Sequence, residues 1–228
     1  MYNPKSAHNQ VSSIQFHSSK SQCHAPMLLP KPVTDPIQYF KDIPWCAKIL
    51  SDKSVVQVAV PDRTPLPSTE SAFIRETLNT PNTVKACITF FRYIKPTAPA
   101  SETGEDKKNP FLELCTFVDL NSGVNGYANT AHGGFYGVVL DEVMGTTANL
   151  QAAQGAFTAS LKVDFKKPLY TPSVVLVRGK VQKKKGKRVF VNGSVEDKDG
   201  NVLASAEGLF IMVDRDIGRW TDKTKSKL

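Results

Sequence analysis

Two carboxylates and a histidine lie in or beside an apolar segment that glycines interrupt. Residues 129–150 read NTAHGGFYGVVLDEVMGTTANL and hold His132, Asp141 and Glu142. The apolar residues recur at spacings of three and four, which predicts a helix over 133–151 that is apolar nearly all round and packs against a sheet. Acids are unusual in such a helix, so the two carboxylates are the candidates for chemistry.

The flanking glycines distinguish Asp141 from Glu142. Successive helical residues point about 100° apart, so the two carboxylates cannot face the same place. Gly137 and Gly145 lie four residues before and after Asp141, whereas larger side chains flank Glu142 in the same way. Each interior glycine costs a helix about 1 kcal/mol relative to alanine, which indicates that another molecule or chain approaches Asp141 closely. A buried ion pair is the ordinary alternative for Asp141, and an ion pair at a surface or interface is favoured for Glu142.

The tripeptide His132-Gly133-Gly134 begins the predicted helix. Its glycines leave the first N–H groups approachable at the positive end of the helix dipole, which suits an anion or an oxyanion. A tight junction between loop and helix would use the same glycines. Together with Asp141, these donors fit acyl transfer, in which an N–H group polarises a carbonyl and a carboxylate acts as nucleophile or activates water.

The spacing of these groups predicts an assembly. Gly133 and Asp141 are eight residues apart, which is roughly 12 Å along a helix, so they cannot both touch one carbonyl carbon. Two antiparallel copies of the helix remove the difficulty, because each copy gives its amino end to the acid of the other. The sequence therefore predicts a two-fold homodimer with two equivalent sites at its interface.

The segments around this helix supply the sheet that must position it. Alternation and β-branched or aromatic content predict strands over 83–94, 111–120, 156–165, 173–182, 188–197 and 202–213. The last three form a meander. Two strands, one long helix and four strands indicate an α+β architecture with a single antiparallel sheet. Residues 35–50 and 68–80 precede the strands and have helical patterns.

Composition indicates one domain with additions at both ends. The chain has 228 residues, of which 40% are apolar and 22% are charged, as in ordinary globular proteins. The N-terminal segment lacks acidic residues and arginine and is rich in polar residues, which predicts a flexible tail over 1–34. We expect a helical extension over 35–80, the core domain over 81–215 and a basic tail over 216–228.

Several classes of function are disfavoured. The net charge is +8, but lysine concentrates only in residues 180–188 and at the C-terminus, so a solvated hairpin is favoured over nucleic-acid binding. No apolar run is long enough to predict a membrane span. The 4 cysteines lack the spacing of metal ligands, so no metal site is expected. A cytoplasmic location is expected, with mitochondria as an alternative because the acid-free start partly fits a presequence.

The pattern H-G-G-x6-D, from His132 to Asp141, resembles the hotdog-fold acyl-CoA thioesterases of the phenylacetate-degradation and thioesterase-superfamily type. The resemblance covers about residues 80–215, and the segment FTASLKVDFKKPL at 157–169 is also typical. It implies a hotdog fold, in which an antiparallel sheet is wrapped around one long central helix. It also implies hydrolysis of an acyl-CoA thioester to free acid and CoA by a dimer, or by a tetramer of two dimers, without a cofactor.

The resemblance also implies roles for individual residues. Asp141 corresponds to the catalytic carboxylate, and Gly133 to the backbone donor to the thioester carbonyl, with His132 shaping its turn. Thr158 corresponds to the hydroxyl that positions the attacking water. Several relatives carry an asparagine six residues before the histidine, where this chain has Gly126.

Further substrate contacts are expected around this centre. Asn129 is the candidate for the missing asparagine contact, and Gly134 adds a second first-turn N–H group. Glu142 is adjacent to the catalytic acid. The phosphates of coenzyme A seek cations, and the hairpin residues Lys184 and Lys185 are the nearest basic patch.

Two other functions fit the same segments. A hotdog hydratase or dehydratase carries a histidine a few residues after the acid, and no histidine follows Asp141. A non-catalytic acyl-CoA-binding or scaffold protein would share the pocket, and a substrate panel distinguishes it from a hydrolase.

Overall fold

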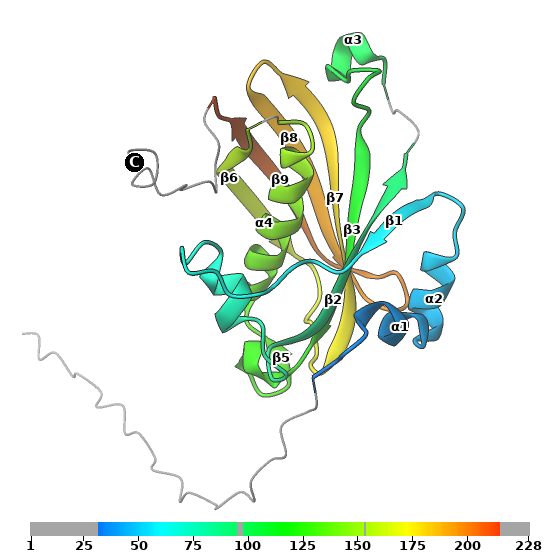
Figure 1. Cartoon of the computed structure of the whole chain (residues 1–228), viewed down its shortest axis with the longest axis vertical. Coiled ribbons are helices and arrows are strands. Elements are labelled where there is room, and N and C mark those ends of the chain that lie inside the picture. The colour runs from blue at the N-terminus through cyan, green and yellow to red at the C-terminus, as the bar shows by residue number, and fades with distance from the viewer. Residues whose placement is uncertain (1–31, 95–97, 153, 215–228) are drawn as a thin grey trace, which may run out of the picture.

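The computed structural model describes residues 32–94, 98–152 and 154–214 (Figure 1). Most of the tail predicted over 1–34, with its possible targeting signal, lies outside the described residues. The basic tail predicted over 216–228 lies wholly outside them.

The described residues form one seven-stranded antiparallel sheet, in the order β1-β2-β3-β7-β8-β9-β6. The strands are β1 (Val55–Ala59), β2 (Val84–Tyr93), β3 (Leu112–Leu120), β6 (Ala156–Phe165), β7 (Ser173–Lys185), β8 (Arg188–Glu196) and β9 (Val202–Met212). Strands β7, β8 and β9 are the predicted meander. Strand β3 pairs with β7 and β6 pairs with β9, so the connection through the long helix joins opposite sides of the meander.

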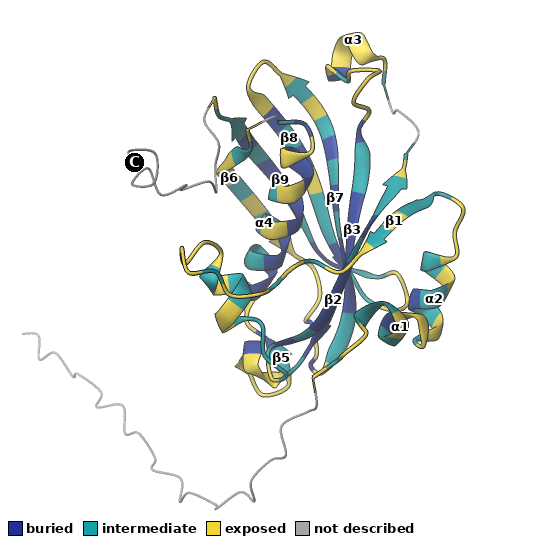
Figure 2. Ribbon diagram, in the orientation of Figure 1, coloured by how far each residue is buried: buried dark blue, intermediate teal, exposed yellow. Residues whose placement is uncertain are grey.

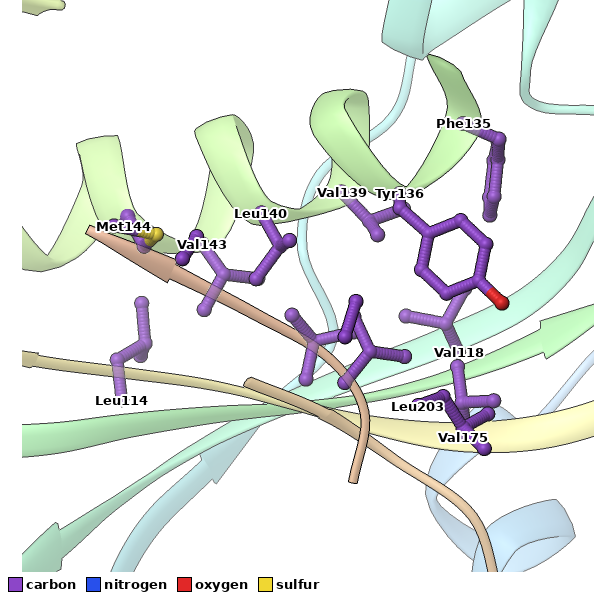
Figure 3. Packing of buried hydrophobic residues seen from close by; sticks show 14 of the residues in the cluster. Leu114, Val118, Phe135, Tyr136, Val139, Leu140, Val143, Met144, Val175 and Leu203 are labelled. Carbon is purple, nitrogen blue, oxygen red and sulfur yellow. The ribbon is translucent and has the colours of Figure 1, made fainter. Parts of the chain in front are cut away.

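The long helix α4 (Gly133–Asn149) packs against β3 and against β6 to β9. Its buried side chains come in pairs one turn apart, which gives a single apolar face: Phe135, Tyr136, Val139, Leu140, Val143, Met144, Thr147 and Ala148. Figure 3 shows several of them above Leu114, Val118 and Val175 of the sheet. An antiparallel sheet that holds one long helix in this way is the hotdog fold, and it confirms the predicted fold class.

The sheet leaves the opposite face of α4 uncovered in the single chain. Residues Gly137, Val138, Asp141, Glu142 and Gly145 are half-buried or exposed there, and Figure 2 shows the change of burial around the helix. The sequence indicated a helix enclosed on nearly all sides. The structure differs because the sheet covers only one side.

A second core lies on the other face of the sheet. Helices α1 (Pro36–Lys41) and α2 (Pro44–Leu50) bring Phe40 and Cys46 against Phe90 and Phe117. Tyr39 also donates a hydrogen bond of 2.7 Å to Asp119 of β3. The early helices are therefore attached to the sheet by both apolar and polar contacts.

The extension predicted as helical over 35–80 also contains strand β1, which pairs with β2. Its five residues give too short an alternation to identify from the sequence. From β1 the chain crosses to the side of the sheet that carries α4 (Figure 1) and forms the π-helix η1 (Phe73–Thr77). The remaining elements are α3 (Ala100–Thr103), the 3-10 helix η2 (Ser122–Val124), β4 (Asn125–Tyr127) and β5 (Thr130–Ala131).

Helix α4 approaches β7 most closely at Gly179. A Cβ atom at this position would meet the side chain of Thr147 and would lie 3.1 Å from the carbonyl oxygen of Val143. Thr147 is itself held by a hydrogen bond of 2.7 Å to that carbonyl. The distance between helix and sheet therefore requires glycine here.

We expect Gly179→Ala to lower the free energy of unfolding by about 1–3 kcal/mol, because the added methyl group forces α4 away from the sheet. Urea unfolding followed by circular dichroism measures the change. Gly137→Ala is the matched control, since a Cβ atom there meets nothing within 4 Å. The control should raise stability by up to about 1 kcal/mol, through helix propensity. Equal stability of Gly179→Ala and the wild type would contradict the steric argument.

Candidate functional site

His132 is the N-cap of α4. Its backbone is extended, and its Nδ1 atom accepts a hydrogen bond of 2.9 Å from the N–H of Gly134. Within the described residues, the N–H of Gly133 has no acceptor. Gly133 therefore provides the approachable donor of the first turn, whereas the N–H of Gly134 is occupied by the histidine.

Gly126 lies directly against His132. A Cβ atom at Gly126 would be 2.9 Å from Cδ2 of the histidine, so no larger residue fits unless His132 moves. An asparagine at position 126 would therefore require His132 to shift. Asn129 is exposed in the turn between β4 and β5, and its backbone carbonyl accepts from the N–H of Thr171. Its side chain is free to meet a ligand on that surface.

Asp141 and Thr158 are brought together by α4 and β6. The hydroxyl of Thr158 donates a hydrogen bond of 2.7 Å to Oδ1 of Asp141. Asp141 is half-buried and Thr158 is exposed on the edge strand. None of the ion pairs formed by the described residues involves Asp141. The carboxylate is thus oriented by a hydroxyl group and has no cation as a partner in this part of the chain.

Glu142 faces a different environment from Asp141. It lines a cavity of about 450 Å³ between α4, the strands β2 and β3, and residues 57–78. The side chain retains access to solvent, but desolvation by the surrounding protein raises the pKa of its carboxyl group, and the negative charge of Asp141 raises it further. The adjacent acids therefore differ in surroundings as the 100° rotation requires. The sequence favours an ion pair at a surface or interface for Glu142. The described residues include no ion-pair partner for it.

The basic hairpin lies near the carboxyl end of α4. Lys184 donates a hydrogen bond of 2.9 Å to the carbonyl of Gln151, just after the helix, and Lys185 is exposed. Lys184 is therefore already engaged in holding the hairpin against the end of the helix, whereas Lys185 extends into solvent.

The described residues contain no group of three or more His, Cys, Asp or Glu side chains placed to hold a metal ion. Cys46, Cys87 and Cys115 are buried free thiols. Burial raises the pKa of Cys46 to about 12, so this thiol is poorly reactive. No helix in the part of the chain that the structure describes combines the length and the apolar character needed to cross a membrane.

The fold and the pattern around α4 agree with the family comparison. Residues 128–204, which contain His132, Asp141 and Thr158, match the family model of the thioesterase superfamily. This match agrees with the family that the sequence pattern resembles.

Individual relatives share only part of their length with this chain. The Mus musculus protein named acyl-coenzyme A thioesterase THEM4 is 36% identical over 93 residues, which cover 40% of this chain and 38% of that protein. A Candida albicans protein named as uncharacterized and mitochondrial is 30% identical over 114 residues, covering 48% of this chain and 50% of the relative. The solved PaaI protein of E. coli, from the phenylacetic acid degradation operon, has a TM-score of 0.44 at 13% identity and covers 46% of this chain and 75% of its own. The chain spans about two fifths of the length of the rodent THEM4 relatives.

The raised pKa of Glu142 predicts a pH dependence of stability. The folded state binds the Glu142 proton more tightly than the unfolded state, so this residue destabilises the fold at high pH. The penalty disappears as the pH falls through its raised pKa. We therefore expect Glu142→Gln to be more stable than the wild type at neutral and alkaline pH, and the difference to shrink in acid.

Thermal unfolding from pH 4 to pH 9 measures this difference. Glu207→Gln is the control for the loss of a carboxylate, because Glu207 is exposed on β9 and does not line the cavity. A Glu142→Gln variant whose stability relative to the wild type is independent of pH would show that the desolvation argument fails.

Proposed function

We propose that the protein is a thioesterase that hydrolyses an acyl-CoA thioester to the free acid and coenzyme A. The hydrogen bond between Thr158 and Asp141 carries the proposal, because it orients a carboxylate without a cation on the uncovered face of α4. The match of residues 128–204 to the thioesterase superfamily model supports the reaction, and the name of the THEM4 relative supports the substrate class.

In the proposed reaction, Asp141 acts on water or on the thioester itself. As a general base, it removes a proton from water while the water oxygen bonds to the carbonyl carbon. The carbon–sulfur bond then breaks, and the coenzyme A sulfur takes up the proton. As a nucleophile, the carboxylate attacks the same carbon and expels the thiolate, and water then cleaves the resulting anhydride. Thr158 holds Asp141 in position in either route.

The N–H of Gly133 polarises the thioester carbonyl and stabilises the negative charge that develops on its oxygen. His132 contributes by fixing the first turn through Gly134. The phenyl ring of Phe165 lies 3.7 Å from where a Cβ atom of Gly133 would be, so the donor has an apolar neighbour.

The proposed site requires a two-fold homodimer, because Gly133 and Asp141 of one chain are roughly 12 Å apart along α4. Two surfaces support this assembly. Strand β6 is the last strand of the sheet, with one edge unpaired in the described chain, and its Phe157 and Phe165 are 47% and 60% exposed. Unpaired edges and exposed aromatic side chains favour association. Pairing through β6 would place the uncovered faces of two α4 helices next to each other.

The remaining substrate contacts and the location belong to the same proposal. Asn129 lies on the surface near the amino end of α4, and Lys185 is the better phosphate ligand of the two lysines because it is not engaged. The name of the Candida albicans relative supports mitochondria as the location rather than the expected cytoplasm.

The first test is the release of coenzyme A from a panel of acyl-CoA thioesters, followed with a thiol reagent. We expect Asp141→Asn to lower kcat by about 10²–10⁴-fold, because it removes the proton acceptor. Thr158→Val should lower kcat by less, and Thr158→Ser should retain most of it. Glu207→Gln controls for the change of carboxylate to amide on the exposed face of β9. Binding of acyl-CoA by the wild type without any thiol release would instead establish the non-catalytic alternative.

The second test removes the donor without breaking the helix. Gly133 is the first residue of α4 and follows the extended His132, and proline is well tolerated at this helix position. We expect Gly133→Pro to fold normally but to lose about 10²–10³-fold in kcat, since proline has no N–H. Gly133→Ala keeps the donor and serves as the control.

Mixing two inactive variants tests the shared site. A heterodimer of Asp141→Asn and Gly133→Pro contains one site with both native groups and one site with neither. Random reassociation should therefore restore about a quarter of the wild-type activity, as two-fold symmetry requires. No recovery, despite proven exchange of subunits, would show that both groups act within one chain.

A further inference from the structure

The cavity beside α4 is a large apolar space that the chain itself leaves unfilled. It has a volume of about 450 Å³, within the roughly 300–1,000 Å³ of small-molecule sites. Its walls include Val138 and Val143 of α4, Leu114 and Val118 of β3, and Leu78 of the extension. The cavity opens to solvent, so its apolar walls are in contact with water, which is unfavourable. An apolar ligand that occupies the space would remove this cost.

The residues that cover the cavity belong to the N-terminal extension. Residues 57–78 lie outside the segment that matches the family model. They are held by polar contacts: Arg63 donates a hydrogen bond of 3.0 Å to the carbonyl of Val84, and Arg75 donates one of 2.7 Å to that of Thr64. Leu78 also packs against the core, so both polar and apolar contacts hold the cover beside the space.

The cavity adjoins the catalytic carboxylate. Val138, Glu142 and Thr146 line it and form one row along α4, with successive members four residues apart. The row of Gly137, Asp141 and Gly145 is its neighbour on the same uncovered face. Glu142 both lines the cavity and reaches solvent, so the cavity opens beside Asp141.

Several polar groups that line the cavity have partners within the chain. Arg75 and Asp62 form an ion pair of 3.5 Å with each other. Thr89 and Thr116 lie opposite each other in the sheet, and their hydroxyl groups are 3.2 Å apart and hydrogen-bonded. The raised pKa of Glu142 lowers the cost of passing an apolar chain over its carboxyl group. The enclosed surface is therefore suited to a hydrocarbon rather than to a charged group.

We propose that this cavity binds the alkyl chain of a medium- or long-chain acyl thioester whose carbonyl group lies at Asp141. This inference rests on the proposed function, because it takes the reacting group to be a thioester at that carboxylate. The chain passes Glu142 and enters between α4 and the strands β2 and β3, under the cover formed by residues 57–78. The extension thus selects the length of the acyl group.

The test measures binding and not turnover. The full chain is titrated with S-alkyl-CoA thioethers of about 4, 8, 12 and 16 carbons, which cannot be hydrolysed, and Kd is obtained by calorimetry. We expect Kd to fall by up to roughly fourfold per added methylene until the cavity is full, and then to level off. Equal Kd values for the 4- and 12-carbon ligands would overturn the proposal.

Two variants locate the chain. Ala59→Phe and Ile74→Phe each place a ring in the cavity from the half-buried or exposed part of its lining, away from the face of α4 that the proposed dimer covers, where folding should tolerate it. We expect the gain in affinity to stop at a shorter chain in both. Asn192→Phe adds the same ring at an exposed site on β8 outside the cavity and should keep the wild-type dependence on length. A wild-type dependence in both cavity variants, with folding verified by their melting temperatures, would place the chain elsewhere.

The outcome also separates this inference from the proposed reaction. Binding that depends on chain length, without release of thiol from any acyl-CoA, would retain the pocket and reject the hydrolase. Release of thiol with Kd values independent of chain length would retain the hydrolase and reject the pocket.

Discussion

The close contact of α4 with the sheet is the constraint on which the site depends. Gly179 allows the backbone of the helix to lie directly over β7, and Gly193 of β8 accommodates the side chain of Met144 in the same way. At this distance the paired apolar residues of one helix face fill the core. The opposite face of the helix is not covered by the sheet. Because the apolar residues are held in the core, the helix cannot rotate about its axis. Asp141 is therefore presented next to β6, where Thr158 reaches it.

Much of this arrangement could be predicted from the sequence because it depends on local patterns. The spacing of the apolar residues predicted α4, and alternation predicted the six longer strands. The glycines around Asp141 distinguished it from Glu142, and the structure places the two acids in different surroundings. The juxtaposition of Asp141 and Thr158, which are 17 residues apart, followed only from the resemblance, since pairing between elements is not encoded in local periodicity.

The remaining features depend on contacts between distant segments. Strand β1 is too short to identify alone and is stabilised by pairing with β2. The capping of Gly134 by His132 depends on a ring orientation, and the contact of Lys184 with Gln151 joins the end of β7 to the turn after α4. The cavity exists because residues 57–78 cross to the α4 side of the sheet. No local pattern in those residues indicates where they lie.

The two adjacent acids on α4 illustrate how one helix can separate two tasks. Asp141 lies toward β6 and is oriented by a hydroxyl group, which suits the role in attack on the carbonyl that we propose for it. Glu142 lies toward the cavity, where desolvation and the charge of its neighbour favour the protonated form. A second full negative charge beside Asp141 would repel the oxyanion that forms during attack on a thioester. Because its pKa is raised, Glu142 gives up that charge more readily than an ordinary glutamate, and an alkyl chain that covers its carboxyl group would raise the pKa further. Occupation of the cavity and activation of the thioester would therefore reinforce each other through the charge of a single side chain.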